Sequence, residues 1–340
     1  MWLAACAALL CACGAPPEEP RRAEHRAPGE APAAGGEPSS AGSSDRAEGR
    51  DGLATGRDDR AAPAESEGPG EAGEPGPARG RPGPWTLERT LANAPFAAPR
   101  APSVVVHATP SFDPAGPLHL VVFLHGWNGC ARVLAGEGAI ACRDGDRPRE
   151  GWGLARRVDE SGVPALFVVP QLAFLERSGD PGRFAEPGRF RAFLEELLAV
   201  LPVGDPSLDR VGSLVLLAHS AGFETALALV ARGGVPIDAV VLFDALYRGV
   251  APFLAWAGGA PERRLVSLYT GSGRTAQQSR MLAARARASL GEVAYDDPRP
   301  LAELLRAHRV VIARSAAPHG EVPARHLAEL LPALVPEGVR

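Results

Sequence analysis

Short apolar segments alternate along most of the chain with segments whose apolar residues recur at helical spacing. The apolar runs are nearly continuous, which is typical of strands in a sheet that is covered on both faces. They occupy residues 103–107, 118–124, 165–169, 214–217, 239–243, 265–269 and 310–313. Helical spacing begins near Pro187, Ala226 and Pro323. Strands that alternate with helices predict an α/β fold with a mostly parallel sheet and right-handed crossovers.

The folded domain is expected to cover residues 85–340. Residues 14–84 contain no aromatic residue, no Val and no Ile, and Leu53 is their single large aliphatic residue. Such a segment buries too little apolar surface to offset the conformational entropy that it would lose on folding. We therefore predict that residues 13–84 form a disordered tether rich in Pro, Gly and Ala.

The first residues resemble an export signal. Residues 1–12 are apolar but far short of the roughly 20 residues that span a bilayer as a helix. Residues 10–13 read Leu-Cys-Ala-Cys and resemble the lipobox of bacterial lipoproteins, which implies a lipid-modified Cys13 and a membrane anchor in the cell envelope. Cys11 and the lack of a positive charge before the apolar run depart from that pattern. An ordinary secretory signal is the alternative, and both interpretations predict export.

The apolar run 214–217 ends close to a serine, after which the spacing becomes helical. Ala218 lies two residues before Ser220, and Gly222 lies two residues after it. This pattern predicts a strand, a sharp turn and a helix, with the Ser220 hydroxyl raised above the sheet. The turn needs small residues at both places because larger side chains would collide with the neighbouring backbone. The alternative is an ordinary buried strand whose following turn contains a serine.

Residues 218–222 read Ala-His-Ser-Ala-Gly and resemble the Gly-x-Ser-x-Gly motif of the α/β-hydrolase family, with Ala218 in place of the first glycine. Asp244 and His319 also follow predicted strands, so the order Ser, Asp, His is that of the family. The resemblance implies an α/β-hydrolase domain in which Ser220, Asp244 and His319 form a catalytic triad. His319 would transfer the proton, and Asp244 would orient its imidazole.

The acid of this triad has competitors. In most of the family it follows the strand that is here 265–269, yet residues 270–275 contain no carboxylate. Some members carry the acid one strand earlier, where Asp244 stands. The alternatives are Asp296 and Asp297, in a Pro-flanked segment before the last strand. We expect Asp244 to be the acid.

A second motif follows the strand at 118–124, where residues 125–129 read His-Gly-Trp-Asn-Gly. Members of the family place their oxyanion loop after such a strand. The resemblance therefore implies that the Trp127 N–H and the Ala221 N–H stabilise an oxyanion.

Four further histidines are not assigned to proton transfer. We expect His125 to order its loop through hydrogen bonds to the backbone, and His219 to pack beside the serine turn. His308 and His326 are expected to face solvent from helices.

Cys130 and Cys142 are the two cysteines outside the predicted signal. In an exported chain, two thiols a short loop apart indicate a disulfide rather than a free pair or a metal site, since no third or fourth ligand has suitable spacing. The bridge would close the loop behind the oxyanion turn. We expect no metal and no cofactor.

A glycine-rich segment offers a rival interpretation. Residues 271–275 read Gly-Ser-Gly-Arg-Thr between a strand and a helix, as in a phosphate cradle. The segment lacks the third glycine and the lysine of such motifs. Thr275 and Gln278 instead predict a capping box, and therefore a plain turn from strand to helix.

The expected function is that of a serine hydrolase that cleaves an ester, carboxylesterase-like or lipase-like, through an acyl-enzyme. Only a short helical segment between Asp244 and Arg263, which includes Tyr247 and Trp256, is available as a cap, so bulky or polymeric acyl substrates could enter; core packing explains its aromatic residues equally well. The expected partner is a small-molecule or polymeric ester. A peptidase or amidase of the same fold and a surface-binding lipoprotein without catalysis are the alternatives. A net charge of −4 gives no reason to expect nucleic acid as a partner.

Overall fold

The computed structural model describes residues 80–97, 99–291 and 293–336. The predicted signal, Cys13 and the tether up to residue 79 lie outside the described residues. Hydrogen bonds to the domain begin before Trp85. The Arg81 N–H donates to Pro202 O at 2.8 Å, and Trp85 Nε1–H donates to Arg81 O at 3.0 Å.

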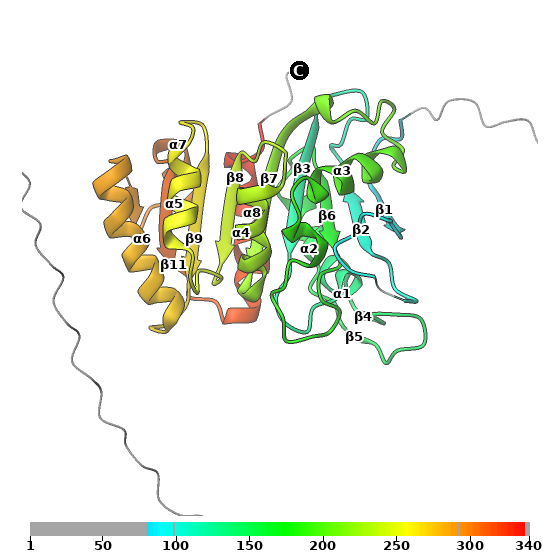
Figure 1. The fold of residues 1–340 in the computed structure, drawn as a ribbon, viewed down its shortest axis with the longest axis horizontal. Helices are drawn as coiled ribbons and strands as arrows, with labels where there is room; N and C mark the ends of the chain where they lie inside the picture. The colour runs from blue at the N-terminus through cyan, green and yellow to red at the C-terminus, as the bar shows by residue number, and fades with distance from the viewer. Residues whose placement is uncertain (1–79, 98, 292, 337–340) are drawn as a thin grey trace, which may run out of the picture. The chain divides into compact units, whose positions relative to one another are not determined.

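One large sheet runs through the domain (Figure 1). Within the described residues it has nine strands in the order β1-β2-β6-β3-β7-β8-β9-β11-β10. The strands are β1 (Trp85–Arg89), β2 (Val104–Ala108), β3 (Leu118–Leu124), β6 (Leu166–Pro170), β7 (Val211–His219), β8 (Ala239–Phe243), β9 (Arg264–Tyr269), β10 (Val293–Tyr295) and β11 (Val310–Arg314). Strand β2 pairs antiparallel with β1 and β6, and the other pairings are parallel. The mostly parallel sheet predicted from the apolar runs is confirmed.

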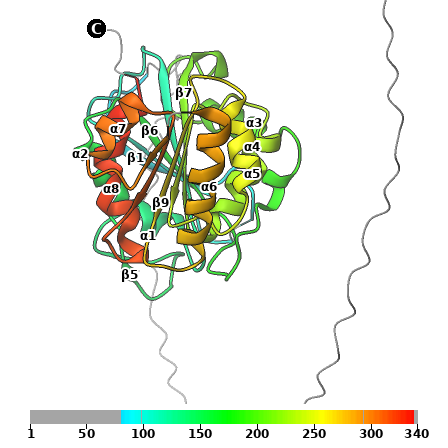
Figure 2. The ribbon, with the colours of Figure 1, turned by 90° about the vertical axis from the view of Figure 1, so that its left-hand side faces the viewer.

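Helices cover both faces of this sheet (Figure 2). One face carries α3 (Arg189–Ala199), α4 (Phe223–Arg232), α5 (Val250–Gly258) and α6 (Arg274–Leu290), and the other carries α1 (Ala131–Ala135), α2 (Leu154–Glu160), α7 (Leu301–Ala307) and α8 (Val322–Leu330). Alternate residues of each strand supply the two cores. In β3, Leu120 and Val122 pack towards α3 and α4, whereas Val121 and Phe123 pack towards α1 and α2. Burial on both faces is why these strands read as continuous apolar runs.

The segment predicted as a small cap is α5. It packs with α4 and α6 against the sheet, and its aromatic residues Phe253 and Trp256 are buried in the core. The helix therefore belongs to the body of the domain, and little of the chain between β8 and β9 remains to cover a site.

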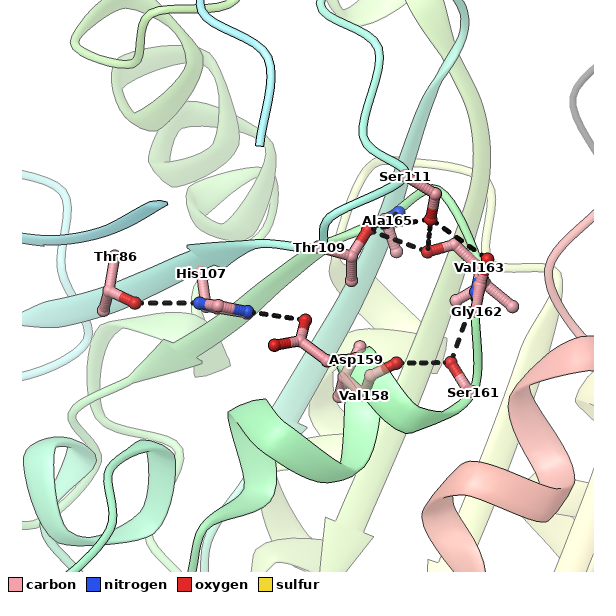
Figure 3. A network of polar contacts seen from close by, with 10 residues as sticks. All are labelled: Thr86, His107, Thr109, Ser111, Val158, Asp159, Ser161, Gly162, Val163 and Ala165. Carbon is pink, nitrogen blue, oxygen red and sulfur yellow. Dashed lines mark hydrogen bonds and ion pairs between the residues drawn. The ribbon is translucent and has the colours of Figure 1, made fainter. Parts of the chain in front are cut away.

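Polar side chains join the antiparallel edge of the sheet to α2 (Figure 3). Thr86 Oγ1 lies 2.8 Å from His107 Nδ1, and His107 Nε2 lies 2.8 Å from Asp159 Oδ1. Beside them, Thr109 Oγ1 donates to Val163 O at 2.8 Å and closes the turn between α2 and β6. These contacts link β1, β2 and α2 through side chains as well as through the strand ladder.

A small antiparallel sheet of β4 (Ala139–Ile140) and β5 (Arg149–Glu150) lies in the loop after α1. Across the part of the chain that the structure describes, no helix combines the length and the apolar character that crossing a bilayer requires.

Candidate active site

The serine stands on a strained turn between β7 and α4. Ser220 has φ +52°, a left-handed conformation that a residue with a side chain rarely adopts. The turn is crowded from the side of β3. A Cβ at Gly222 would lie 2.2 Å from Leu124 O, and one at Gly126 would lie 2.7 Å from Ser220 Cβ. The predicted strand, sharp turn and helix are present, and the alternative of an ordinary turn does not account for the strain.

The sheet register brings Asp244 to the same edge as Ser220. His219, the last residue of β7, pairs with Phe243, the last residue of β8. Ser220 and Asp244 therefore leave neighbouring parallel strands at the same level. Asp244 also has a positive φ, +44°, and its N–H donates to Leu268 O of β9 at 2.7 Å.

Asp244 and His319 are hydrogen-bonded. His319 follows β11, and its Nδ1 lies 2.6 Å from Asp244 Oδ2. The Asp244 side chain is only 5% exposed, whereas that of His319 is 42% exposed. No hydrogen bond joins Ser220 Oγ to His319, both of which are described. In serine hydrolases, the hydrogen bond between the serine and the histidine is often long in the absence of substrate and shortens when substrate binds.

Two threonines complete the surroundings of the Asp244 carboxylate. Oδ1 accepts from the Thr270 N–H at 3.0 Å and from Thr275 Oγ1 at 2.5 Å, and Oδ2 accepts from Thr270 Oγ1 at 2.5 Å. Burial by itself would raise the pKa of Asp244, but the hydrogen bonds from His319, Thr270 and Thr275 outweigh it and lower the pKa to about 2. The carboxylate is therefore ionised at neutral pH.

The capping box predicted at Thr275 is wrong. Helix α6 begins at Arg274 with Gly273 as its N-cap, and no side chain caps it. The Thr275 hydroxyl instead donates to Asp244, because the strand-to-helix turn runs directly past that carboxylate. Sequence reasoning missed the role of Thr270 and Thr275, although both stand in the loop that it had searched for an acid.

The competing acids are occupied elsewhere. Asp296 Oδ2 accepts from the Tyr269 hydroxyl at 2.6 Å, and Asp297 pairs with Arg299 at 2.8 Å. The structure therefore brings His319 together with Asp244 and with neither of the alternatives.

The loop after β3 lies against the serine turn. His125 is buried, with Nδ1 2.9 Å from Gly126 O, and its Nε2 accepts from the Leu172 N–H at 3.0 Å. Burial lowers the pKa of His125 to about 4, so the ring is neutral and orders the loop through backbone contacts, as expected. The Trp127 N–H has no acceptor among the described residues. The assignment of Trp127 and Ala221 as oxyanion donors stays a prediction.

His219 packs against His319 and contacts its backbone. Its Nε2 lies 3.0 Å from His319 O, and the two rings are 4.7 Å apart. Burial and, to a smaller extent, the neighbouring His319 lower the pKa of His219 to about 4. A neutral His219 that donates to the His319 carbonyl fixes the loop after β11, which agrees with the predicted structural role.

The prediction for His326 is wrong. Its side chain is 15% exposed, and its Nε2 lies 2.9 Å from Ser315 Oγ. The residue therefore ties α8 to the end of β11 rather than facing solvent. His308 directly follows α7 and is half-buried.

Cys130 and Cys142 are joined in the structure, with their Cα atoms 5.8 Å apart. Cys130 directly precedes α1, and both cysteines are buried with Val133. The bridge closes the loop that carries β4, next to the turn at Trp127, where the sequence predicted it.

Two cavities meet at the serine and the histidine. One of 300 Å³ is lined by the loop after β3 and reaches Trp152, and the other of 590 Å³ is lined by residues at the start of α4 and reaches Tyr247. Ser220, His319 and Trp127 line both cavities, and Trp127 is 58% exposed. Sequence reasoning used only the Trp127 backbone, and it named Tyr247 only as part of the segment available as a cap or for core packing. No signal in the sequence distinguishes these aromatic side chains from core residues.

A serine turn between β7 and α4, approached by the loops after β8 and β11 of a mostly parallel sheet, defines the α/β-hydrolase fold. No family model matches the chain, and no curated protein matches it.

Similar solved structures include a thermostable esterase with 16% identity and a TM-score of 0.40, over 73% of this chain and 61% of that one. A second is a mutant of the feruloyl esterase module from Clostridium thermocellum, with 9% identity and a TM-score of 0.48 over 78% of this chain and 93% of that one. A third is a thermophilic carboxylesterase from a metagenomic library, with 13% identity and a TM-score of 0.41 over 74% of this chain and 89% of that one. The chain thus spans 61% of the length of the thermostable esterase. These similarities are too low to assign a function.

Proposed function

We propose that the protein is a serine hydrolase that cleaves a carboxylic ester through an acyl-enzyme. The observation that carries this proposal is the 2.6 Å contact between His319 Nδ1 and the buried Asp244 carboxylate, next to a serine held at φ +52°. A histidine with only a structural role would not need an exposed ring whose Nδ1 contacts a buried, ionised carboxylate.

The proposed chemistry begins with attack of Ser220 Oγ on the ester carbonyl carbon, while His319 Nε2 takes the hydroxyl proton. Asp244 stays ionised and stabilises the imidazolium. The negative charge on the carbonyl oxygen is met by the N–H groups of Trp127 and Ala221. The tetrahedral intermediate then expels the alcohol, which receives the proton from His319.

The second half of the cycle repeats these roles with water. His319 takes a proton from a water molecule, which attacks the acyl carbon, and Ser220 leaves with that proton as the carboxylic acid is released. Two cavities that meet at Ser220 suit an ester, because its acyl and alcohol arms extend in different directions from the carbonyl carbon.

A fluorophosphonate probe tests the activated serine directly, because it reacts only with a serine whose hydroxyl is activated. The wild-type protein should be labelled, and Ser220→Ala should not. Turnover of p-nitrophenyl esters of increasing chain length then tests ester cleavage. Lack of labelling in the folded wild-type protein would favour the non-catalytic binding protein, and labelling without ester turnover would favour a peptidase or amidase.

Export and anchoring form the second part of the proposal. A lipid on Cys13 would hold the domain at a membrane of the cell envelope, at the end of the predicted tether. The protein should then partition with membranes, and Cys13→Ser should release it or stall its processing. Unchanged membrane association of Cys13→Ser would contradict the lipid anchor and leave the ordinary secretory signal.

A further inference from the structure

The larger cavity beside the serine is cationic. It has a volume of 590 Å³ and contains two arginines and one glutamate in addition to the aromatic residues already described. The charged residues are Arg248, Arg274 and Glu224. With two positive charges and one negative charge, the side chains that line the cavity carry a surplus of one positive charge; the buried Asp244 carboxylate lies behind His319 and does not line it.

The surplus is concentrated at Arg274. Arg248 pairs with Glu224 at 2.9 Å and stacks over the Phe223 ring at 5.3 Å, so its charge is compensated. Among the described residues, no carboxylate lies within ion-pair distance of Arg274. Within the part of the chain that the structure describes, the Arg274 side chain makes one hydrogen bond, from Nε to Tyr247 O at 2.9 Å.

That bond orients the guanidinium while its terminal N–H groups remain available. Arg274 is the first residue of α6 and is exposed, so a ligand in the cavity can reach it. A guanidinium presents N–H groups in a planar fork that matches a carboxylate, and one unpaired charge matches a monoanion. The hydrogen bond to Tyr247 O orients the guanidinium before a ligand binds, which reduces the conformational entropy lost on binding.

We propose that this cavity binds a carboxylate on one arm of the ester substrate, with Arg274 as the specificity-determining contact. The inference rests on the proposed function for its assignment of the cavity to an ester arm. The substrate is then a half-ester of a dicarboxylic acid, or an ester whose alcohol carries a carboxylate.

Two pairs of esters test which arm carries the charge. For the acyl arm, 4-nitrophenyl hydrogen adipate is compared with 4-nitrophenyl methyl adipate. For the alcohol arm, 4-carboxyphenyl pentanoate is compared with 4-(methoxycarbonyl)phenyl pentanoate. In at least one pair, kcat/KM of the wild-type protein should favour the charged ester by about 10- to 100-fold. The preference should fall as salt rises, because the arginine is exposed.

Variants of helix α6 show whether Arg274 is responsible. Arg274→Gln should remove the preference for the charged ester, and Arg274→Lys should restore part of it. Arg280→Gln is the matched control, because it removes the same charge from an exposed position of the same helix outside the cavity. Equal kcat/KM within both ester pairs, or a preference that survives Arg274→Gln, would overturn the carboxylate site.

Binding to Ser220→Ala separates this inference from the proposed function. Calorimetry with intact esters should show tighter binding of the charged member, and this difference should vanish in Ser220→Ala/Arg274→Gln. Turnover of neutral esters without a charge preference would overturn the carboxylate site and leave the hydrolase. Tighter binding of the charged esters that depends on Arg274, without turnover of any ester, would support the site and contradict the ester hydrolase.

Discussion

Two histidines in the described part of the chain are hydrogen-bonded to aspartates at similar distances. His319 lies 2.6 Å from Asp244 at the serine turn, and His107 lies 2.8 Å from Asp159 at the antiparallel edge of the sheet. A threonine hydroxyl completes the second set, 2.8 Å from the other nitrogen of the His107 ring (Figure 3). By residue type, both places hold a hydroxyl, an imidazole and a carboxylate. Ser220, His319 and Asp244 are called the serine-turn set below, and Thr86, His107 and Asp159 are called the edge set.

Exposure separates the two sets. At the serine turn the acid is 5% exposed and the histidine 42%, whereas at the edge the histidine is 8% exposed and the acid 29%. Both ring nitrogens of His107 are bonded within the protein, so the ring has no position from which to exchange a proton with a substrate. Only Nδ1 of His319 is bonded within the described residues. His319 lines both cavities, and its second nitrogen is unbonded among the described residues, which fits the proposed proton transfer. His107, with both nitrogens occupied, is a structural link between β1, β2 and α2.

The backbone conformations of the two sets also differ. Ser220 and Asp244 have positive φ values, +52° and +44°, whereas Thr86 and His107 lie in regular strands. Strain of this kind persists where the surrounding structure imposes it, and it clusters at functional sites. The edge set needs no strain because it only joins elements that are already formed.

Replacement of the two acids should give the sharpest contrast. Asp244→Asn should lower kcat by up to about 10⁴-fold without loss of the fold, because the amide no longer fixes the tautomer of His319 or stabilises its charged form. Ester turnover and circular dichroism measure the two effects. A folded Asp244→Asn protein with near-wild-type kcat, together with loss of activity in Asp297→Asn, would mean that the acid is assigned to the wrong strand.

The threonines behind Asp244 should have an intermediate effect. Thr275→Val removes one hydrogen bond to a buried carboxylate, which stabilises by about 1.5–3 kcal/mol when intact. We expect kcat to fall roughly 10-fold with a smaller change in KM, and Thr275→Ser to recover most of the loss because it keeps the hydroxyl. An equal loss in Thr275→Ser would indicate a packing role for Thr275 in place of a positioning role.

The pH dependence of stability should also distinguish the serine-turn set. Asp244 has a pKa of about 2 in the folded protein, below its ordinary value of 3.8, so its ionisation stabilises the fold above pH 3.8. That contribution should be lost as the pH falls from about 4 to about 2. The difference in unfolding free energy between wild type and Asp244→Asn, followed by urea denaturation, should shrink over this range. A difference independent of pH would show that the carboxylate is not preferentially stabilised in the fold.

The edge set should give the smallest effect on activity. Asp159→Asn weakens a partly exposed contact, so the unfolding free energy should fall by about 1 kcal/mol, and kcat/KM should stay within about two-fold of wild type. Denaturation and ester turnover provide the readouts. If Asp159→Asn lowered kcat as far as Asp244→Asn, the distinction between a catalytic and a structural pair would be lost.

Short segments of the sequence predicted the strands, the serine turn and the disulfide of this protein. The apolar runs predicted the strands, because burial on both faces requires them. The small residues Ala218 and Gly222 predicted the serine turn, and at Gly222 the backbone passes so close to Leu124 that a Cβ would collide with it. The short spacing of Cys130 and Cys142 predicted their pairing. Each of these features depends on residues that are close together in the sequence.

The tertiary structure decided which distant groups meet. His319 lies 75 residues after Asp244, and only the strand order and the path of the loop after β11 place it there rather than beside Asp297. The same packing turns Thr275 from an expected helix cap into a donor to Asp244, and it leaves Arg274 without a carboxylate partner among the residues that the structure describes. Residue types and spacing cannot specify such contacts, because they depend on the relative positions of separate elements, which form only when the two cores pack against the sheet.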